Sequence, residues 1–261
     1  MGLLNFLHNI KYLSDNLLYN KFKYEMINQE RMSLIVENLK YELKDDLYSL
    51  TVPKIKTPED TIRDLIENKK SISRFGDGEF MLAFGQSIPF QKYSPELGTR
   101  LKEILISKRD IPVGIGRYFF YSLRNALPLI KTFVRTWVYE NREKMLKLMD
   151  LNKQYYSTEF SQLYMTYREY DYEVHFKNVR KIWEKRDVVI IQGKGVLNNF
   201  KYNVFDNTSS LEHLIAPSKD AFLEYESILK KAIEIPKDKL VIFILGPTAT
   251  VLAYDLANLG Y

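Results

Sequence analysis

The strongest constraint on the fold comes from two short apolar runs that contain no polar residue. Val188-Val189-Ile190-Ile191 and Leu240-Val241-Ile242-Phe243-Ile244-Leu245 lack the alternation expected of a strand with one face in water. Such runs are typical of parallel strands that are covered on both faces. Parallel strands need crossover connections, which are usually helices, so these runs predict an α/β protein.

The rest of the chain after residue 57 alternates between strand-length and helix-length segments. Thr57 and Pro58 open the first helix as N-cap and first helical residue, and Gly260 closes the last one. This order predicts a Rossmann-like, mostly parallel sheet flanked by helices. Strands are expected at 71–75, 111–115, 187–191, 211–215 and 240–245, and helices at 79–84, 95–107, about 122–149, 174–184, 222–233 and 248–259.

The first 52 residues have a different pattern. Apolar residues recur mostly at three- and four-residue steps from Leu3 to Leu43, with an interruption at 14–16. We therefore expect a helical N-terminal arm at 1–52 and a Rossmann-like catalytic domain at 53–261. The arm could pack on its own domain, form a homodimer contact, or make a peripheral contact with a membrane surface.

Composition excludes several classes of protein. The chain has 261 residues and no Cys, which rules out disulfides and Cys-ligated metal sites. It also lacks a bilayer-spanning apolar run and a signal-peptide cleavage site, so we expect a soluble, cytoplasmic protein. The 38 basic residues are spread among 33 acidic ones without a dense basic stripe, so nucleic acid is not an expected partner.

The segment that best indicates chemistry is Arg74-Phe75-Gly76-Asp77-Gly78-Glu79, which runs from a predicted strand into a loop and helix. Ligands of open α/β sheets bind at the carboxyl ends of strands. Two carboxylates at that place would repel a phosphate unless a cation lay between them, and on extended backbone both would point to one side. Asp77 and Glu79 are therefore predicted to hold Mg²⁺ or Mn²⁺, with Arg74, Phe75, Gly76 and Gly78 contacting the substrate. The alternative is an ordinary Gly-Asp-Gly turn, with Glu79 favouring the helix N-terminus.

Two further loops follow predicted strands. Gly193 and Lys194 could approach a nucleotide, and Gly246 and Thr248 could hold a phosphate or a sugar hydroxyl at a helix N-terminus. The alternatives are a plain turn at Gly193 and an N-cap role for Thr248. Asp206 is the candidate general base for an acceptor hydroxyl.

The segment from Arg74 to Glu79 resembles the Asp-X-Glu motif of the bacterial GT-D-fold glycosyltransferases. The similarity runs from about Thr57 onward and includes three further segments, Val204-Phe205-Asp206-Asn207, Ile215-Ala216-Pro217 with the nearby Ala221-Phe222, and Leu245-Gly246-Pro247-Thr248-Ala249-Thr250. The resemblance implies transfer of a hexose from a UDP-sugar to a glycan or glycoprotein acceptor, with Asp77 and Glu79 as metal ligands. It also implies a part in the glycosylation of serine-rich adhesins or in surface-polysaccharide synthesis.

The chain departs from the family pattern in two places. Residues 197–203 read Leu-Asn-Asn-Phe-Lys-Tyr-Asn where the family has an Arg and a Gly-rich stretch, and the sequence ends at Tyr261 where the family continues into another strand. These departures keep a second function open. In that alternative, the chain is a non-catalytic partner of another glycosyltransferase.

Overall fold

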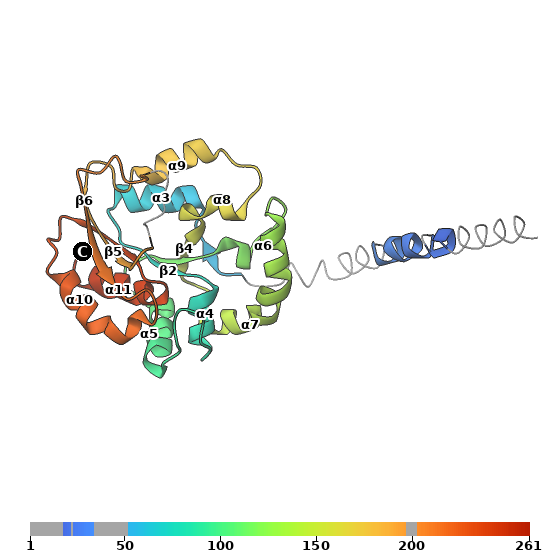
Figure 1. The fold of residues 1–261 in the computed structure, drawn as a ribbon, viewed down its shortest axis with the longest axis horizontal. Helices are drawn as coiled ribbons and strands as arrows, with labels where there is room; N and C mark the ends of the chain where they lie inside the picture. Colours follow the sequence, from blue (N-terminus) through green and yellow to red (C-terminus); the bar gives the residue numbers. More distant parts are fainter. Residues whose placement is uncertain (1–17, 22, 34–51, 197–202) are drawn as a thin grey trace, which may run out of the picture. The chain divides into compact units, whose positions relative to one another are not determined.

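The computed structural model describes residues 18–21, 23–33, 52–196 and 203–261 (Figure 1). The chain divides into two units, Met1–Thr51 and Val52–Tyr261. In the first unit the described residues are helical. No helix in the described ranges combines the length and apolarity needed to span a bilayer.

The first sheet of the second unit carries the Asp77 loop. Its four strands are β1 (Lys54–Ile55), β2 (Ser73–Phe75), β3 (Val113–Ile115) and β4 (Gln154–Ser157). All pairs are parallel in the order β1-β4-β3-β2, so β2 lies at one edge. Phe75 is opposite Ile115, and Ile115 is opposite Ser157, so the loops that follow β2, β3 and β4 leave the sheet side by side.

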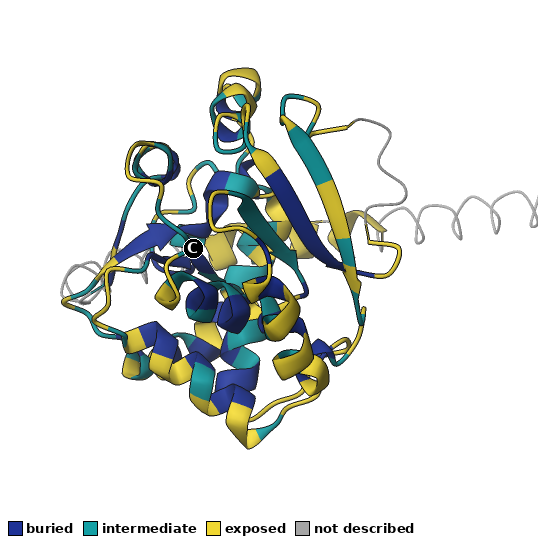
Figure 2. Cartoon of the chain, turned by 90° about the vertical axis from the view of Figure 1, so that its left-hand side faces the viewer, coloured by how far each residue is buried: buried dark blue, intermediate teal, exposed yellow. Residues whose placement is uncertain are grey.

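The second sheet contains the two apolar runs. Its strands are β5 (Asp187–Gly193), β6 (Ser210–Ala216) and β7 (Leu240–Ile244), parallel in the order β6-β5-β7. Residues 188–193 of the central strand are buried, whereas β6 is partly exposed along its length (Figure 2). The absence of polar alternation in β5 therefore has the expected physical cause, which is cover on both faces.

Helices connect and cover the strands. α3 begins after Thr57, whose side chain accepts a hydrogen bond from Asp60 N, as the sequence predicted. The largest apolar cluster lies between the first sheet and α4, α5 and α7, and a second cluster joins β5 to α10 and α11. The helices are α3 (Pro58–Glu67), α4 (Asp77–Ala83), α5 (Pro95–Ile106), α6 (Pro128–Phe133), α7 (Tyr139–Leu148), α8 (Leu163–Thr166), α9 (Tyr172–Arg180), α10 (Tyr225–Ile233) and α11 (Pro247–Asn258), with short 3₁₀ turns at Arg117–Phe119, Thr158–Ser161 and Ala221–Glu224.

The predicted fold class is confirmed, with local corrections. Two strands, β1 and β4, were missed, because the first has two residues and the second reads Gln-Tyr-Tyr-Ser without an apolar run. The helix predicted from about residue 122 begins instead at Pro128, where proline is well tolerated at the first helical position. It also contains a π-helical turn, Val134–Val138, between α6 and α7.

Candidate active site

The Asp77 loop lies at the carboxyl end of β2. The strand ends at Phe75, Gly76 is the N-cap, and α4 begins at Asp77, so both acidic residues occupy the first turn of a helix. The expectation that they sit on extended backbone is therefore wrong. Gly76 has an ordinary extended conformation, with φ −107° and ψ −166°, so a positive φ is not the reason for glycine there.

Phe75 was predicted to contact the substrate, and this is wrong. Its side chain is completely buried and packs against Phe80, with 6.0 Å between ring centroids. Along β2 the residues alternate between the two faces, so Phe75 anchors the loop from the core. The Asp77 side chain, by contrast, is exposed.

Glu79 closes the first turn of α4. Its Oε2 accepts a hydrogen bond from Gly76 N at 2.7 Å, which is the half of a capping box that a glycine N-cap can form. Burial raises the pKa of the Glu79 carboxyl above its ordinary value, and the hydrogen bonds from the backbone and the charge of Arg74 only partly oppose this rise. Glu79 therefore has the structural role considered as the alternative, and its carboxyl retains a second oxygen for other contacts.

Thr250 connects this loop to α11. Its hydroxyl donates to the Arg74 carbonyl at 2.7 Å and lies 3.5 Å from Glu79 Oε1. Ser73 Oγ in turn donates to the Thr250 carbonyl at 2.6 Å. The edge strand β2 is thus joined to the first turn of the helix that follows the second sheet.

Arg74 places a cation among these groups. Its side chain lies along β3 beside Gly114, and Nη2 is 3.4 Å from the Thr158 carbonyl. The Nε–H is buried and has no hydrogen-bond partner among the described residues. An unpaired buried donor is costly, so this atom is available to an acceptor that a ligand would bring.

The loops after β3 and β4 form the other side of the site, and sequence analysis missed them. Glu159 is buried and accepts hydrogen bonds from Tyr118 N at 2.8 Å and from the Tyr167 hydroxyl at 3.0 Å. Burial, together with the negative charges of Asp77 and Glu159, raises the pKa of the Tyr118 hydroxyl. Glu159 therefore fixes the backbone of Tyr118 at the carboxyl end of β3.

Residues 72–261 match the sequence profile of a family described as "Glycosyltransferase GT-D fold". The chain belongs to this family. It is 29% identical over 218 residues to "Glycosyltransferase GlyD" of Streptococcus pneumoniae serotype 4, and 30% identical over 207 residues to "Probable glycosyl transferase Gly" of Streptococcus gordonii. A solved structure, "A New Glycosyltransferase (DUF1792) from Streptococcus sanguinis", superposes with a TM-score of 0.75 at 29% identity, covering 80% of this chain and 79% of that one.

The GT-D similarity to the curated relatives is confined to a part of those proteins. The matched region is 81% of this chain but 26% of GlyD, and 76% of this chain but 29% of Gly. The chain thus spans less than a third of each relative. The region that matches the family profile includes the Asp77 loop, the whole second sheet and every strand of the first sheet except β1.

The predicted loops of the second sheet lie at the carboxyl ends of β5 and β7. Gly193 ends β5, and a Cβ there would approach the Ser218 backbone to 2.8 Å, while Lys194 is exposed. Gln192 beside it is buried, and its Oε1 has no hydrogen-bond partner in the described part of the chain. This unpaired acceptor was not predicted, because a single Gln at a strand end carries no sequence signal.

The Gly246 loop differs from both predictions made for Thr248. Gly246, with φ +55°, is the N-cap of α11 and Pro247 the first helical residue, so Thr248 is not the cap. The Thr248 side chain is completely buried, and its hydroxyl donates to Gln91 Oε1 at 3.2 Å. It therefore fixes the loop between α4 and α5 and does not face a ligand.

Asp206 does not lie at this site. It precedes β6, at the amino-terminal edge of the second sheet, and pairs with Arg180 at the end of α9. Parallel strands place their carboxyl ends at the opposite edge, so the general-base prediction for Asp206 is wrong. The altered segment, 197–203, lies outside the described residues except for Asn203.

The donor set at the Asp77 loop suits a hard divalent cation. Mg²⁺ and Mn²⁺ accept one or two carboxylates and complete their shell with water and phosphate oxygens. Asp77 is exposed and Glu79 has one oxygen that is only weakly engaged. No group of three or more His, Cys, Asp or Glu side chains suited to a metal occurs among the described residues, so any cation here would depend on ligand oxygens as well.

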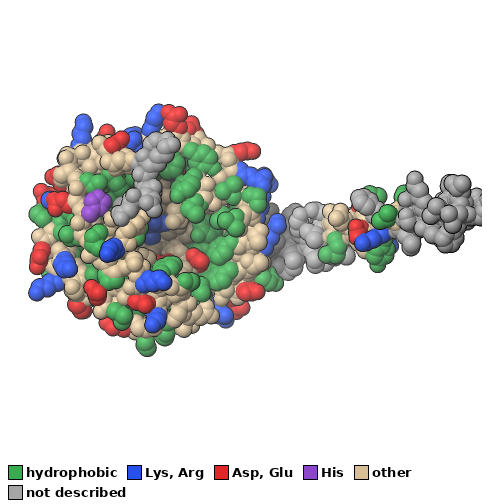
Figure 3. All heavy atoms as spheres, in the orientation of Figure 1, with side chains coloured by type: hydrophobic (Ala, Val, Ile, Leu, Met, Phe, Trp, Pro, Cys, Tyr) green, Lys and Arg blue, Asp and Glu red, His purple; other side chains and the backbone are tan. Residues whose placement is uncertain are grey.

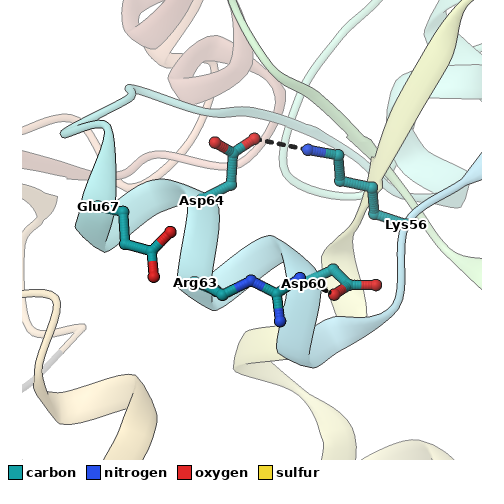
Figure 4. A pocket seen from close by; sticks show the side chains of 5 residues that line it. All are labelled: Lys56, Asp60, Arg63, Asp64 and Glu67. Atoms are coloured by element: carbon teal, nitrogen blue, oxygen red, sulfur yellow. Dashed lines mark hydrogen bonds and ion pairs between the residues drawn. The ribbon is translucent and has the colours of Figure 1, made fainter.

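A separate hollow beside α3 has a different character. It has a volume of about 350 Å³ and is lined by Lys56, Asp60, Arg63, Asp64 and Glu67 (Figure 4). Lys56 Nζ pairs with Asp64 Oδ2 at 2.6 Å, and Arg63 pairs with Asp60. Because these charges largely satisfy one another, we place the functional site at the Asp77 loop.

Proposed function

We propose that the chain is a metal-dependent glycosyltransferase that moves a hexose from a nucleotide-sugar, a UDP-sugar in the simplest case, to a glycan or glycoprotein acceptor. The observation that carries this proposal is the grouping of Asp77, Glu79 and the unpaired Arg74 Nε–H at the carboxyl end of β2. Family membership supports the reaction class.

Each group has a role in this proposal. Asp77, and Glu79 through its outer oxygen, would hold Mn²⁺ or Mg²⁺, which when bound neutralises charge on the departing diphosphate. Arg74 would donate its unpaired Nε–H to a diphosphate oxygen. Glu79 also keeps α4 closed against Gly76, so that Asp77 is presented at a fixed position.

The second sheet would receive the nucleotide. Gly193 ends β5 and Gly246 follows β7, so both lie at the carboxyl edge of this sheet, where the unpaired Gln192 Oε1 could accept a hydrogen bond from a base N–H. Lys194 is exposed nearby and would add positive charge.

The experiment compares Asp77→Asn and Glu79→Gln with wild type. UDP release from UDP-glucose, UDP-galactose and UDP-N-acetylglucosamine is measured with and without Mn²⁺, and UDP binding is measured by calorimetry. Asp77→Asn should lower Mn²⁺-dependent release on the order of a hundredfold, because a metal contributes several kcal/mol to the transition state. Glu79→Gln keeps the capping geometry while removing the charge. A loss of UDP release in this variant therefore reports the chemistry of the carboxylate separately from folding.

Asp110→Asn is the matched control, since Asp110 is an exposed carboxylate paired with Lys70 away from the loop. It should behave as wild type. Undiminished release in Asp77→Asn would reject the metal site. Absence of Mn²⁺-dependent UDP affinity in wild type would instead favour the non-catalytic partner.

A further inference from the structure

Three aromatic side chains, Tyr118, Phe133 and Trp137, contact the ring of Phe119, whose centroid lies 6.0 Å from that of Phe80 in α4, the helix that begins at Asp77. We call them the aromatic wall. The rings of Phe133 and Trp137 are stacked, with centroids 5.5 Å apart and planes 8° from parallel, and Tyr118 meets Phe133 edge-on at 6.4 Å. All three are only partly buried. Each ring therefore retains exposed surface while its inner side packs on the core.

The wall depends on an unusual backbone. Phe133 ends α6 and Trp137 lies in the π-helical turn Val134–Val138, a conformation that is rare and often found at functional sites. The turn adds one residue to the helical repeat and thereby sets how the two rings face each other. The Thr136 hydroxyl donates to the Thr132 carbonyl at 3.0 Å, which gives the widened turn a side-chain hydrogen bond.

Tyr118 links the wall to the site. It follows Gly116 at the carboxyl end of β3, and its ring folds back over that glycine, so that a Cβ on Gly116 would lie 2.7 Å from the ring. β3 pairs with β2, which carries the Asp77 loop. Figure 3 shows a hollow near the middle of the face that is turned toward the viewer, with hydrophobic side chains gathered on the side of α6 and α8.

We infer that the aromatic wall binds the terminal hexopyranose ring of the acceptor, by stacking against the apolar C–H face of the sugar. This inference rests on the proposed glycosyltransferase function and adds the acceptor subsite to it. The exposed parts of these aromatic rings offer apolar surface that matches the apolar C–H face of a pyranose ring.

The position of the wall favours an acceptor sugar over a nucleobase. The glycine loops and the unpaired Gln192 acceptor belong to the second sheet, which meets β2 through Thr250 of α11. Tyr118 instead approaches β2 from β3, the neighbour within the first sheet. Asp77 therefore lies between the two groups of features, as expected if donor and acceptor meet at that residue.

The test uses the two tryptophans of the chain. In the 261-residue Trp183→Phe variant, Trp137 is the sole tryptophan, and its fluorescence, excited selectively over tyrosine, is titrated with the methyl glycosides of glucose, galactose and N-acetylglucosamine, and separately with UDP and Mn²⁺. We expect saturable quenching by at least one methyl glycoside. In the same background, Phe133→Leu should weaken that binding by about tenfold, since loss of an aromatic partner has an effect of this order.

A second comparison separates binding from folding. Trp137→Leu keeps apolar volume but removes the flat face, and Trp183→Leu makes the same change next to Phe205, far from the loop in the chain. Trp137→Leu should have the same UDP affinity and the same acceptor-independent UDP release as Trp183→Leu, but should lose methyl glycoside binding. Isothermal calorimetry measures both binding reactions.

Two results would overturn the inference. One is the absence of any Trp137 response to all three methyl glycosides. The other is a large loss of UDP affinity in Trp137→Leu relative to Trp183→Leu, which would assign the wall to the nucleobase. Asp77→Asn distinguishes this inference from the proposed function, because it should lower Mn²⁺-dependent UDP release on the order of a hundredfold while leaving methyl glycoside quenching intact. Quenching without any UDP release in wild type would reject the catalytic proposal alone.

Discussion

The Glu79 carboxylate accepts a hydrogen bond from Gly76, so the side chain proposed to share a cation also closes the first turn of α4. A glutamate at the third helical position can both cap the helix and bind a cation, because capping uses one carboxylate oxygen and leaves the other. Thr250 is within 3.5 Å of that second oxygen. At the scale of single residues, structural and chemical roles therefore coincide at Glu79 and are separate at Asp77, which is exposed.

Gly246 is the residue whose replacement should be least tolerated outside the Asp77 loop. Its φ of +55° and ψ of −140° are unfavourable for other residues, and a Cβ there would lie 2.8 Å from the Phe90 ring. We expect Gly246→Ala to lower the free energy of unfolding by roughly 3 kcal/mol, measured by urea denaturation.

Gly85→Ala is the matched control for this change. Gly85 has φ +88°, but a Cβ at this position would have Tyr93 Cζ as its nearest neighbour, at 4.0 Å, so only the backbone cost of about 1–2 kcal/mol applies. Equal losses in the two variants would show that the Phe90 contact is irrelevant.

Individual site residues were predictable only where they form a local motif. Asp77 and Glu79 follow a strand and are separated by one residue, which the sequence displays directly. Tyr118 and Glu159 are 41 residues apart along the chain and meet only because β3 and β4 pair. Asp206 was misplaced because the sequence does not show at which edge of the sheet its loop lies.

At the scale of elements, the strongest prediction came from strands with an unbroken apolar run. β5 and β7 carry such runs, at 188–191 and 240–244, and were recognised. β4 was not recognised, because Tyr155 and Tyr156 use their hydroxyls in hydrogen bonds while their rings are buried. The helix expected at 122–149 was right in type, but periodicity does not reveal its π-helical turn. The loops that depend on β4 were therefore missed as well.

Lys153 provides a test of how α5 is attached to β4. Its ammonium donates to the carbonyls of Leu105 and Ser107, at 3.2 and 2.6 Å, at the end of α5. Burial lowers the pKa of Lys153 to about 8. In the unfolded state the pKa of Lys153 is near 10.4. Between about pH 8 and pH 10.4 the unfolded state therefore binds more protons than the folded state, and the contribution of Lys153 to the free energy of unfolding should rise with pH.

The measurement is urea unfolding of wild type and Lys153→Met from pH 7.5 to 10.5. The difference in unfolding free energy, wild type minus variant, should increase between about pH 8 and pH 10.4. A flat or falling difference would contradict the lowered pKa.

At the scale of the whole molecule, all three apolar clusters of the described residues lie within Val52–Tyr261. This unit should therefore fold without residues 1–51. We expect the protein truncated to 52–261 to keep its thermal midpoint within a few degrees and to keep its Mn²⁺-dependent UDP affinity. Size-exclusion chromatography of both forms tests the predicted homodimer contact of the arm. If the arm makes this contact, the protein elutes as a dimer with residues 1–51 and as a monomer without them.

The two sheets of this unit are not joined by strand pairing in the described residues, since β2 and β7 each end their own sheet. What joins them is the packing of α11, which follows β7, against the first sheet, because Val251 and Tyr254 belong to the largest apolar cluster and Asp255 pairs with Arg100 of α5. The Thr250 bridge and the hydrogen bonds from Asp220 N to the Phe90 carbonyl, at 2.9 Å, and from Thr248 to Gln91 add polar contacts at the same junction. The two halves therefore share one core and should unfold in a single melting transition, so the sheet that carries the reactive loop gains part of its stability from a helix that follows the other sheet.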